Sequence, residues 1–230
     1  MRLGITRTIK LTLASFFIQT SWSFSSLQTL GFLFSLLHGA RKGERHEFQS
    51  NYHKTFDTHP YMASYIIGAV LREHEDKKLA PDRIGHFISI AQTSFATAGD
   101  LLFWQTVRPA LLLYATILGL KIGIIGPIMA FIVYNSLHFY HRIQGFREGY
   151  EKGIDIIYVL RTKRFTIVQR VFEFLGALAT GGLIALVTID FNALLIIPLC
   201  LVFIGLLFKR VASTIIIIIA IFITMAIVLV

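Results

Sequence analysis

Apolar and polar positions divide the chain near residue 85. Before that point, apolar runs are short and alternate with clusters of charged residues at 41–47 and 72–78. After it, several apolar stretches reach the length of a membrane span, namely 110–140, 174–189, 191–208 and 211–230. A helix of about 20 apolar residues crosses the hydrocarbon core of a bilayer. The pattern therefore predicts an all-α membrane protein with a polar N-terminal region, 1–84, and a membrane domain, 85–230.

The N-terminal region is expected to lie in the cytoplasm and along the inner membrane interface. Segments 25–39 and 60–71 have the pattern of short helices that are too polar or too short to cross a bilayer. The first residues favour an interfacial amphipathic helix, with basic side chains near lipid headgroups. Its expected apolar contacts are Leu11, Phe16, Phe17 and Ile18. The segment lacks a small-residue cleavage site, so we do not expect a cleaved signal peptide.

The membrane domain is expected to contain a hairpin and about three to four transmembrane helices. The hairpin is placed at 86–109, and the helices at about 110–138, 171–189, 191–208 and 211–230.

The orientation of these segments follows from the basic residues, which collect in cytoplasmic loops of membrane proteins. Lys and Arg are frequent between 142 and 170, and Lys209-Arg210 follows the next pair of apolar stretches. If the N-terminus is also cytoplasmic, the chain must enter and leave the membrane on the same side between 86 and 140. A re-entrant helical hairpin shielded by protein satisfies this requirement. The chain is thus predicted to be a multi-pass protein of the cell (inner) membrane.

Net charge and cysteine content narrow the function classes. The formal charge is +9, with 22 Lys and Arg against 13 Asp and Glu, but no nucleic-acid-binding module is recognisable. Orientation in the membrane explains the basic excess better than a nucleic-acid partner does. Cys200 is the only cysteine, so the chain cannot form an internal disulfide.

Four motifs in order along the chain resemble a known family. They are "SFFIQTSWSFSSLQTLGF" (15–32), "FDTHPYMAS" (56–64), "GDLLFWQTVRP" (99–109) and "GFREGYEKG" (145–153). Together they are similar to the IID membrane subunit of the mannose/fructose/sorbose-type sugar phosphotransferase system. The stretch "GIIGPIMAFIVYN" (123–135) also resembles a segment of that family.

The resemblance implies a function and a set of partners. A IID subunit and a IIC subunit together conduct the sugar, and IIA and IIB subunits carry the phosphoryl group to it. The chain is therefore expected to be non-catalytic, to need no cofactor, and to join a homo-oligomeric assembly of IIC–IID pairs in the lipid bilayer.

The chain also departs from the family pattern. Thr93, Ser94 and Thr97 stand where the family carries Gly, Pro and Gly, and Gln105 replaces a usual Gly. Glycine permits backbone conformations that other residues resist, so these changes bear on the hairpin bend. A second hypothesis follows, in which the protein is a degenerate IID-like regulatory or assembly scaffold that does not transport.

Asp100 and Arg108 are charged residues within a membrane-length segment. Such charges cost roughly 2.5–3.5 kcal/mol on insertion scales, so they are normally paired or face a polar cavity. Their spacing places both on one face of a helix. One interpretation is that Asp100 accepts a sugar hydroxyl and that Arg108 orients it or contacts the partner subunit. The alternative is an internal structural ion pair.

Three further residues complete the predicted substrate-binding set: Trp104, Thr106 and Asn135. Trp104, with Phe103, has the chemistry to stack on a sugar ring, although Trp also anchors proteins at the bilayer interface. Asn135 lies in an apolar helix and needs a polar partner there, either the sugar or another helix.

Asp57, Thr58, His59 and Pro60 form the polar centre of the second motif. His59 has no second His or Cys at ligand spacing, which argues against a metal site. Pro60 favours the start of a helix that Asp57 or Thr58 would cap. The four residues are predicted to form a structural corner, or alternatively to face IIC or IIB at the cytoplasmic mouth.

Overall fold

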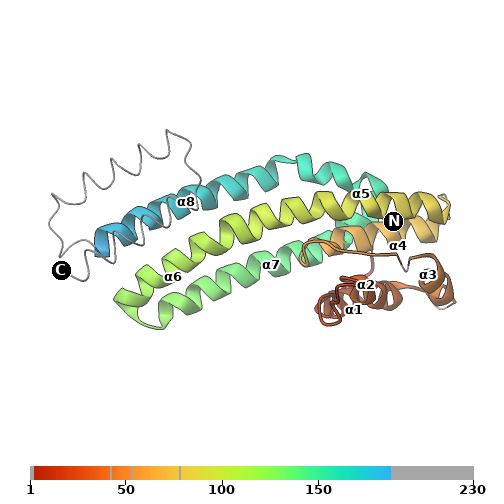
Figure 1. The fold of residues 1–230 in the computed structure, drawn as a ribbon, viewed down its shortest axis with the longest axis horizontal. Helices are drawn as coiled ribbons and strands as arrows, with labels where there is room; N and C mark the ends of the chain where they lie inside the picture. Colours follow the sequence, from red (N-terminus) through yellow and green to blue (C-terminus); the bar gives the residue numbers. More distant parts are fainter. Residues whose placement is uncertain (1–2, 42, 53, 78, 188–230) are drawn as a thin grey trace. The chain divides into compact units, whose positions relative to one another are not determined.

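The computed structural model describes residues 3–41, 43–52, 54–77 and 79–187, and within these ranges the only regular secondary structure is helical (Figure 1). The all-α prediction is therefore confirmed for this part of the chain. Residues 1–179 group into one compact unit, and the residues from Thr180 onward group separately. The helices predicted at 191–208 and 211–230 lie outside the described residues.

The N-terminal region consists of short helices joined by irregular segments. They are α1 (Ile5–Ser15), α2 (Thr29–Gly39), α3 (Arg45–Asn51) and α4 (Ala63–Asp76). The expected helices at 25–39 and 60–71 correspond to α2 and α4. Lys77, in a left-handed conformation with φ of 50°, ends α4.

A long helical rod follows, built from α5 (Pro81–Gly99), η1 (Asp100–Val107) and α6 (Arg108–Ile122). Pro81 occupies the first position of α5, where its missing N–H leaves no hydrogen bond unmade. The chain reverses at Gly123, whose φ of 66° suits glycine, and returns as α7 (Ile125–Lys152). In Figure 1, α6 and α7 run side by side as the two arms of this reversal.

The position of the reversal differs from the sequence expectation. We expected the hairpin at 86–109 followed by one helix over about 110–138, but 81–122 is continuous and the bend falls at Gly123. The Thr and Ser residues of 91–98 stay in the helix, where Ser94 and Thr97 donate their hydroxyls to the carbonyls of Ile90 and Thr93. The depth of the hairpin in a bilayer stays a prediction.

After α7, the chain forms the 3-10 helix η2 (Gly153–Arg161) and then α8 (Lys163–Val187). Within the described residues, two helices are long and apolar enough to cross a membrane, Pro81–Ile122 and Lys163–Leu186. The second of these overlaps the helix predicted at 171–189.

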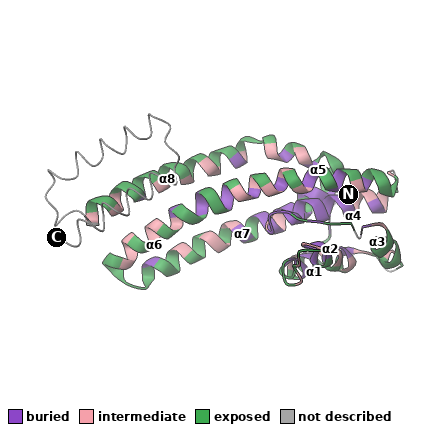
Figure 2. Cartoon of the chain, viewed as in Figure 1, coloured by how far each residue is buried: buried purple, intermediate pink, exposed green. Residues whose placement is uncertain are grey.

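The core lies where α4 packs against α5 and the C-terminal half of α7 (Figure 2). Nearly every side chain of α4 from Ala63 to Leu71 is buried, whereas α6 and the first half of α7 are largely exposed. We expected a boundary near residue 85 between a cytoplasmic region and a membrane domain. That assignment stays a prediction, but in the packing both regions share one core.

Three glycines let α4 and α7 approach with their backbones in contact. A Cβ placed on Gly149 would overlap the carbonyl oxygen of Tyr65 and lie 2.9 Å from the amide nitrogen of Ala69. A Cβ on Gly68 would lie 2.9 Å from the amide nitrogen of Tyr150, and one on Gly145 would overlap the Ser64 hydroxyl. Close helix packing through small residues is a common device of membrane proteins.

Buried charges also hold the helices together. Glu75, at 1% side-chain exposure, accepts an ion pair from Arg7 of α1, another from Arg41 at 2.7 Å, and a 2.6 Å hydrogen bond from the Tyr150 hydroxyl of α7. Arg142 of α7 donates a hydrogen bond of 2.8 Å to the Ser15 hydroxyl. A buried carboxylate requires such partners because leaving it unpaired is costly.

The orientation of α1 corrects part of the sequence expectation. Leu11 and Ile18 are buried in the protein core, not exposed to lipid. Phe16 and Phe17 are exposed as expected, together with Ile5, Ile9 and Leu13. The sequence could not identify which apolar face of the helix is covered by the rest of the chain.

We predict that Gly149→Ala lowers the free energy of unfolding by about 1–3 kcal/mol, because the new methyl group meets the α4 backbone. The control is Gly85→Ala in α5, where an added Cβ has no heavy atom within 4 Å. That change is expected to be neutral or to stabilise by about 0.5–1 kcal/mol. Unfolding in detergent measures both, and equal effects of the two substitutions would contradict the backbone contact.

Candidate functional site

The second and third motifs pack directly against each other. His59 lies over Gly99, where a Cβ would overlap the imidazole ring. The ring stacks on Phe103 with centroids 5.3 Å apart and an interplanar angle of 14°, and its centroid lies 5.0 Å from that of Trp104. Gly99 and Phe103 therefore form the surface that receives the corner of residues 57–60.

Hydrogen bonds from other elements hold this corner in place. The Gln28 side chain, from the first motif, donates a hydrogen bond of 2.8 Å to the carbonyl of Thr58. The Thr58 hydroxyl donates a hydrogen bond of 2.9 Å to the carbonyl of Gln92 on α5, and the Asp57 N–H donates one of 3.2 Å to the Gln92 side chain. Two separate parts of the chain thus converge on these residues.

The helix entry differs in detail from the prediction. α4 begins at Ala63, three residues after Pro60, and neither Asp57 nor Thr58 makes a capping hydrogen bond to it. Instead, the carbonyl of His59 accepts the N–H groups of Met62 and Ala63 at 2.9 and 3.1 Å. The corner role of the motif is consistent with this geometry, but the cap comes from backbone, and the Thr58 hydroxyl is used by Gln92.

The His59 ring is buried and neutral. Its Nδ1 accepts the N–H of Tyr61 at 3.3 Å, and its Nε2 has no hydrogen-bond partner among the described residues. Burial, and secondarily the positive charge of Arg142, lowers the pKa of His59 to about 3. With 1% of its surface exposed, the ring packs the corner and is closed to a phosphoryl donor.

The third motif adopts a π-helix, η1. The Thr106 hydroxyl donates a hydrogen bond of 2.8 Å to the carbonyl of Leu101, five residues earlier. The backbone N–H of Arg108 likewise donates to the carbonyl of Phe103, also five residues earlier. π-Helical segments are rare and frequently mark functional sites. This winding turns Phe103 and Thr106 inward and leaves Trp104 and Arg108 exposed. Phe103, considered above for sugar stacking, instead packs in the core.

Trp104, Arg108 and Asn135 meet at a cavity of about 550 Å³ between η1, α6 and α7. Tyr61 and Tyr134 also line it, and their hydroxyls lie 3.2 Å apart. The cavity therefore combines aromatic faces with a guanidinium, an amide and phenolic hydroxyls. Such a set suits an uncharged polyhydroxylated ligand, which presents apolar ring faces and hydroxyl edges.

Sequence reasoning missed the two tyrosines. Tyr61 lies within the second motif, and Tyr134 directly precedes Asn135. Their proximity in sequence to predicted site residues is the only signal that could have identified them. The Asn135 amide nitrogen donates a hydrogen bond of 2.8 Å to the carbonyl of Phe131 on its own helix, and the residue lines the cavity.

The two other predicted substrate-binding residues lie apart from this cavity. Thr106 is buried and bonded to Leu101. Asp100 is half-buried near Asp57, close enough for the two carboxylates to repel each other, and no ion pair with Arg108 is found among the described residues. Partial burial raises the pKa of the Asp57 carboxyl. The structure thus groups Asp100 with the corner and Arg108 with the cavity.

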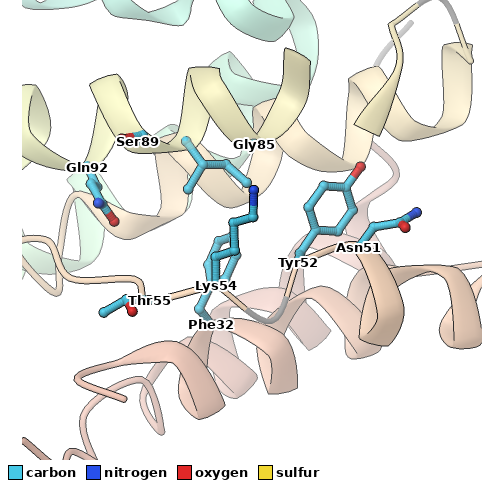
Figure 3. A pocket seen from close by; sticks show the side chains of 9 residues that line it. Phe32, Asn51, Tyr52, Lys54, Thr55, Gly85, Ser89 and Gln92 are labelled. Carbon is cyan, nitrogen blue, oxygen red and sulfur yellow. The ribbon is translucent and has the colours of Figure 1, made fainter. Parts of the chain in front are cut away.

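A second cavity of about 380 Å³ lies between α2, the segment after α3, and α5 (Figure 3). Its lining is polar apart from Phe32, Tyr52 and Ile88, and Lys54 extends beside Phe32 toward α5. Gln92 connects this cavity to the corner through its bonds with Asp57 and Thr58. None of the predicted substrate-binding residues lines it.

Comparisons with known proteins agree with the resemblance of the motifs. Residues 3–195 match the family described as the PTS system mannose/fructose/sorbose family IID component. The mannose-specific EIID component of Escherichia coli K12 is 30% identical over 155 residues, which are 63% of this chain and 55% of that protein. The fructose permease IID component of Bacillus subtilis is 26% identical over 178 residues, 74% of this chain and 65% of that protein. The chain spans little more than half the length of the mannose-specific relative.

Two solved structures share the fold. One is a complex of the mannose transporter ManYZ with microcin E492, with a TM-score of 0.61 and 23% identity, covering 98% of this chain and 96% of that one. The other is described as a membrane protein, with a TM-score of 0.66 and 27% identity, covering 80% of this chain and 71% of that one.

We predict that acid destabilises the fold through His59. Its folded pKa of about 3 lies below its ordinary value of 6.5, so the unfolded chain binds more protons between these values and stability falls as the pH drops through that window. At pH 5, this one group is expected to cost about 2 kcal/mol relative to pH 7.5.

Thermal unfolding in detergent at several pH values tests this. His59→Gln is expected to flatten the pH dependence, and the exposed His38→Gln is the matched control that leaves it unchanged. An unchanged slope in His59→Gln would contradict the buried neutral imidazole.

Proposed function

The chain belongs to the mannose/fructose/sorbose family of IID components of the phosphotransferase system, and on this premise we propose that it forms a sugar-translocating unit with a IIC subunit. In this proposal, the chain provides one wall of the pathway for a hexose or related sugar during phosphorylation-coupled uptake. Several IIC–IID pairs assemble into one oligomer. The observation that carries the proposal is the cavity at Trp104, Arg108 and Asn135, which is built where the second and third motifs meet.

We place the protein in the cell membrane with its N-terminus in the cytoplasm. Two described helices, Pro81–Ile122 and Lys163–Leu186, have the length and hydropathy of membrane spans. The basic residues between 142 and 170 mark the cytoplasmic side by the positive-inside rule. With the N-terminus in the cytoplasm as well, the segment 81–152 enters and leaves the membrane on the same side, as a re-entrant hairpin within a multi-pass protein.

Trp104 and Arg108 are assigned to the sugar side of the cavity. Trp104 offers an indole that is 46% exposed and is held at its inner edge by His59. An indole face suits the C–H face of a sugar ring, and a guanidinium donates paired hydrogen bonds to hydroxyls. Asn135 adds an amide from the opposite arm, so the site closes between α6 and α7.

Asp100 is assigned to a neighbouring acceptor position. Together with Asp57 it presents two carboxylates beside the corner, and carboxylates accept hydroxyl hydrogen bonds. Asp100 is close in sequence to Trp104 and Arg108, which line the cavity. In the structure, however, it lies beside Asp57 of the corner. Asp57 is exposed, so it is open to the sugar or to the IIC or IIB subunit.

Phosphoryl transfer is assigned to the IIA and IIB subunits. The role of this chain is to bind and guide the sugar until it meets the phosphorylated partner. The histidine of the second motif, His59, fits this division because its buried ring is out of reach of a phosphocarrier partner.

The experiment that tests the proposal is uptake by cells that express the cognate IIC, IIA and IIB subunits with or without this chain. Phosphoenolpyruvate-dependent accumulation of labelled sugar that requires the chain is the expected result. If the complex assembles and no sugar enters, the protein is a IID-like scaffold and the transport proposal fails.

We predict that Trp104→Ala and Arg108→Gln each lower sugar uptake at least about tenfold. This corresponds to a loss of about 1.4 kcal/mol in the free energy of sugar binding, or to an equal rise in the transport barrier. Co-purification with IIC verifies assembly. Trp22→Ala is the matched control, because Trp22 is 45% exposed and lies outside the cavity. Equal uptake by the Trp104 and Trp22 variants would remove the cavity from the sugar path.

Asp100→Asn is expected to impair uptake mainly through a higher KM, because the amide keeps the shape of the side chain but loses the charge that accepts sugar hydroxyls. Asp82→Asn, at an exposed position on α5, is the control. Uptake measured over a range of sugar concentrations separates KM from the maximal rate. Wild-type kinetics in Asp100→Asn would show that Asp100 does not contact the sugar.

A further inference from the structure

An apolar groove of about 320 Å³ runs between α1 and α7, away from the cavity of the proposed sugar site. On the α1 side it is lined by Ile5, Ile9, Leu13 and the following Phe16, with Thr8 and Thr12 between them, and on α7 by Phe139, Ile143 and Arg147. Ile5, Ile9 and Leu13 are 72%, 55% and 58% exposed, at the i, i+4, i+8 spacing of one helix face. This face is separate from the one that carries Leu11 into the core.

The groove has a direction. α1 and α7 run antiparallel here, since Ser15 and Phe16 lie against Arg142 and Phe139 while Arg7 lies over Tyr150. Arg147 is therefore at the Ile5 end, and the aromatic pair Phe16 and Phe139, with centroids 5.7 Å apart, closes the other end. One end is cationic and the other is apolar.

Arg147 is available to an external anion. Its side chain is exposed, and no ion pair or hydrogen bond to it is found among the described residues. Other arginines of this region are occupied: Arg142 bonds Ser15 and His138, and Arg164 bonds Glu148. The exposed guanidinium, unpaired among the described residues, thus stands at the mouth of an apolar channel, which is the arrangement that an amphiphile with an anionic head requires.

The length of the groove matches one leaflet of a bilayer. From Arg147 to Phe139 the α7 axis rises about 12 Å, and from Ile5 to Phe16 the α1 axis rises about 16 Å, at about 1.5 Å per residue. Half of a hydrocarbon core of roughly 30 Å is about 15 Å. In the orientation proposed above, on which this step rests, Arg147 faces the cytoplasmic headgroups and the aromatic end faces the bilayer interior.

We infer that this groove binds one acyl chain of an anionic phospholipid, with its phosphate on Arg147. The apolar face of α1 then packs along the acyl chain, with its Ile5 end toward the headgroups. The negative headgroups of the cytoplasmic leaflet favour a basic residue at this depth. The bound lipid joins α1 to α7 on the membrane side, opposite the Glu75 ion pairs that join them on the protein side.

The test uses the full chain co-purified with its IIC subunit and a phosphatidylglycerol that carries a photoreactive group on one acyl chain. Mass spectrometry of the labelled peptides is expected to place the label within 5–16 and 139–147. Arg147→Gln is expected to lower labelling of this region about fivefold, in line with the contribution of one basic residue at a membrane surface. Ile9→Trp is expected to lower it by filling the groove.

Matched controls separate the groove from general lipid contact. Arg83→Gln removes an exposed charge from α5, and Ile132→Trp enlarges an α7 side chain that is 57% exposed and outside the groove. Both should leave labelling unchanged. A photoreactive phosphatidylcholine should label the groove less strongly and be insensitive to Arg147→Gln.

Three results would overturn the inference. Equal labelling by both lipids without an effect of Arg147→Gln would show nonselective solvation by lipid. Loss of labelling in excess inorganic phosphate would assign Arg147 to a free anion. Cross-links from α1 to IIC, or to a second copy of the chain, would show that protein covers the groove. Sugar uptake, measured on the same variants, reports on the transport proposal independently.

Discussion

The contact between the backbones of α4 and α7 determines where the functional side chains of this protein lie. Gly68 meets the backbone of residues 146–150, and Gly145 and Gly149 receive Ser64 and Tyr65. Because the contact involves backbone and not flexible side chains, it permits little sliding of one helix along the other. α4 begins directly after the 57–60 corner, and α7 carries Tyr134 and Asn135, so this one contact sets the distance between the corner and the cavity.

The corner transmits this placement to the third motif. His59 packs on Gly99 and stacks on Phe103, which lies inside the π-helix η1. The π winding then turns Trp104 and Arg108 outward toward Tyr134 and Asn135. A histidine that resembles a catalytic group is thus a packing element. Its ring is buried and neutral, and its Nε2 finds no hydrogen-bond partner within the part of the chain that the structure describes. The motifs of the family form one packed unit and not a set of independent sites.

The sequence supports correct predictions where the signal is local or compositional. Hydropathy and helical periodicity predicted an all-α chain, and the ordered motifs identified the family. Of the five predicted substrate-binding residues, Trp104, Arg108 and Asn135 line one cavity in the structure, and their role in binding stays a prediction. Each of these inferences depends on residue type at a position, which one sequence displays directly.

The features that could not be predicted depend on tertiary contacts. Tyr61 reaches Tyr134 across 73 positions of sequence, so no local pattern pairs them. The bend was expected in 86–109 because the distribution of basic residues requires the chain to enter and leave the membrane on one side, yet the Ser and Thr hydroxyls of 91–98 bond within the helix and Gly123 provides the reversal. For α1, both helix faces are apolar, and only the packing shows that Leu11 faces the core.

The most direct test of the account is whether the transported sugar shields the cavity. In a Cys200→Ala background, single cysteines at Asn135 and at the neighbouring, exposed Ser136 are compared for their reaction with a small thiol reagent. The account predicts that the sugar slows modification at position 135, which lines the cavity, and leaves position 136 unchanged. Equal modification of position 135 with and without sugar, in a complex that still transports, would contradict it.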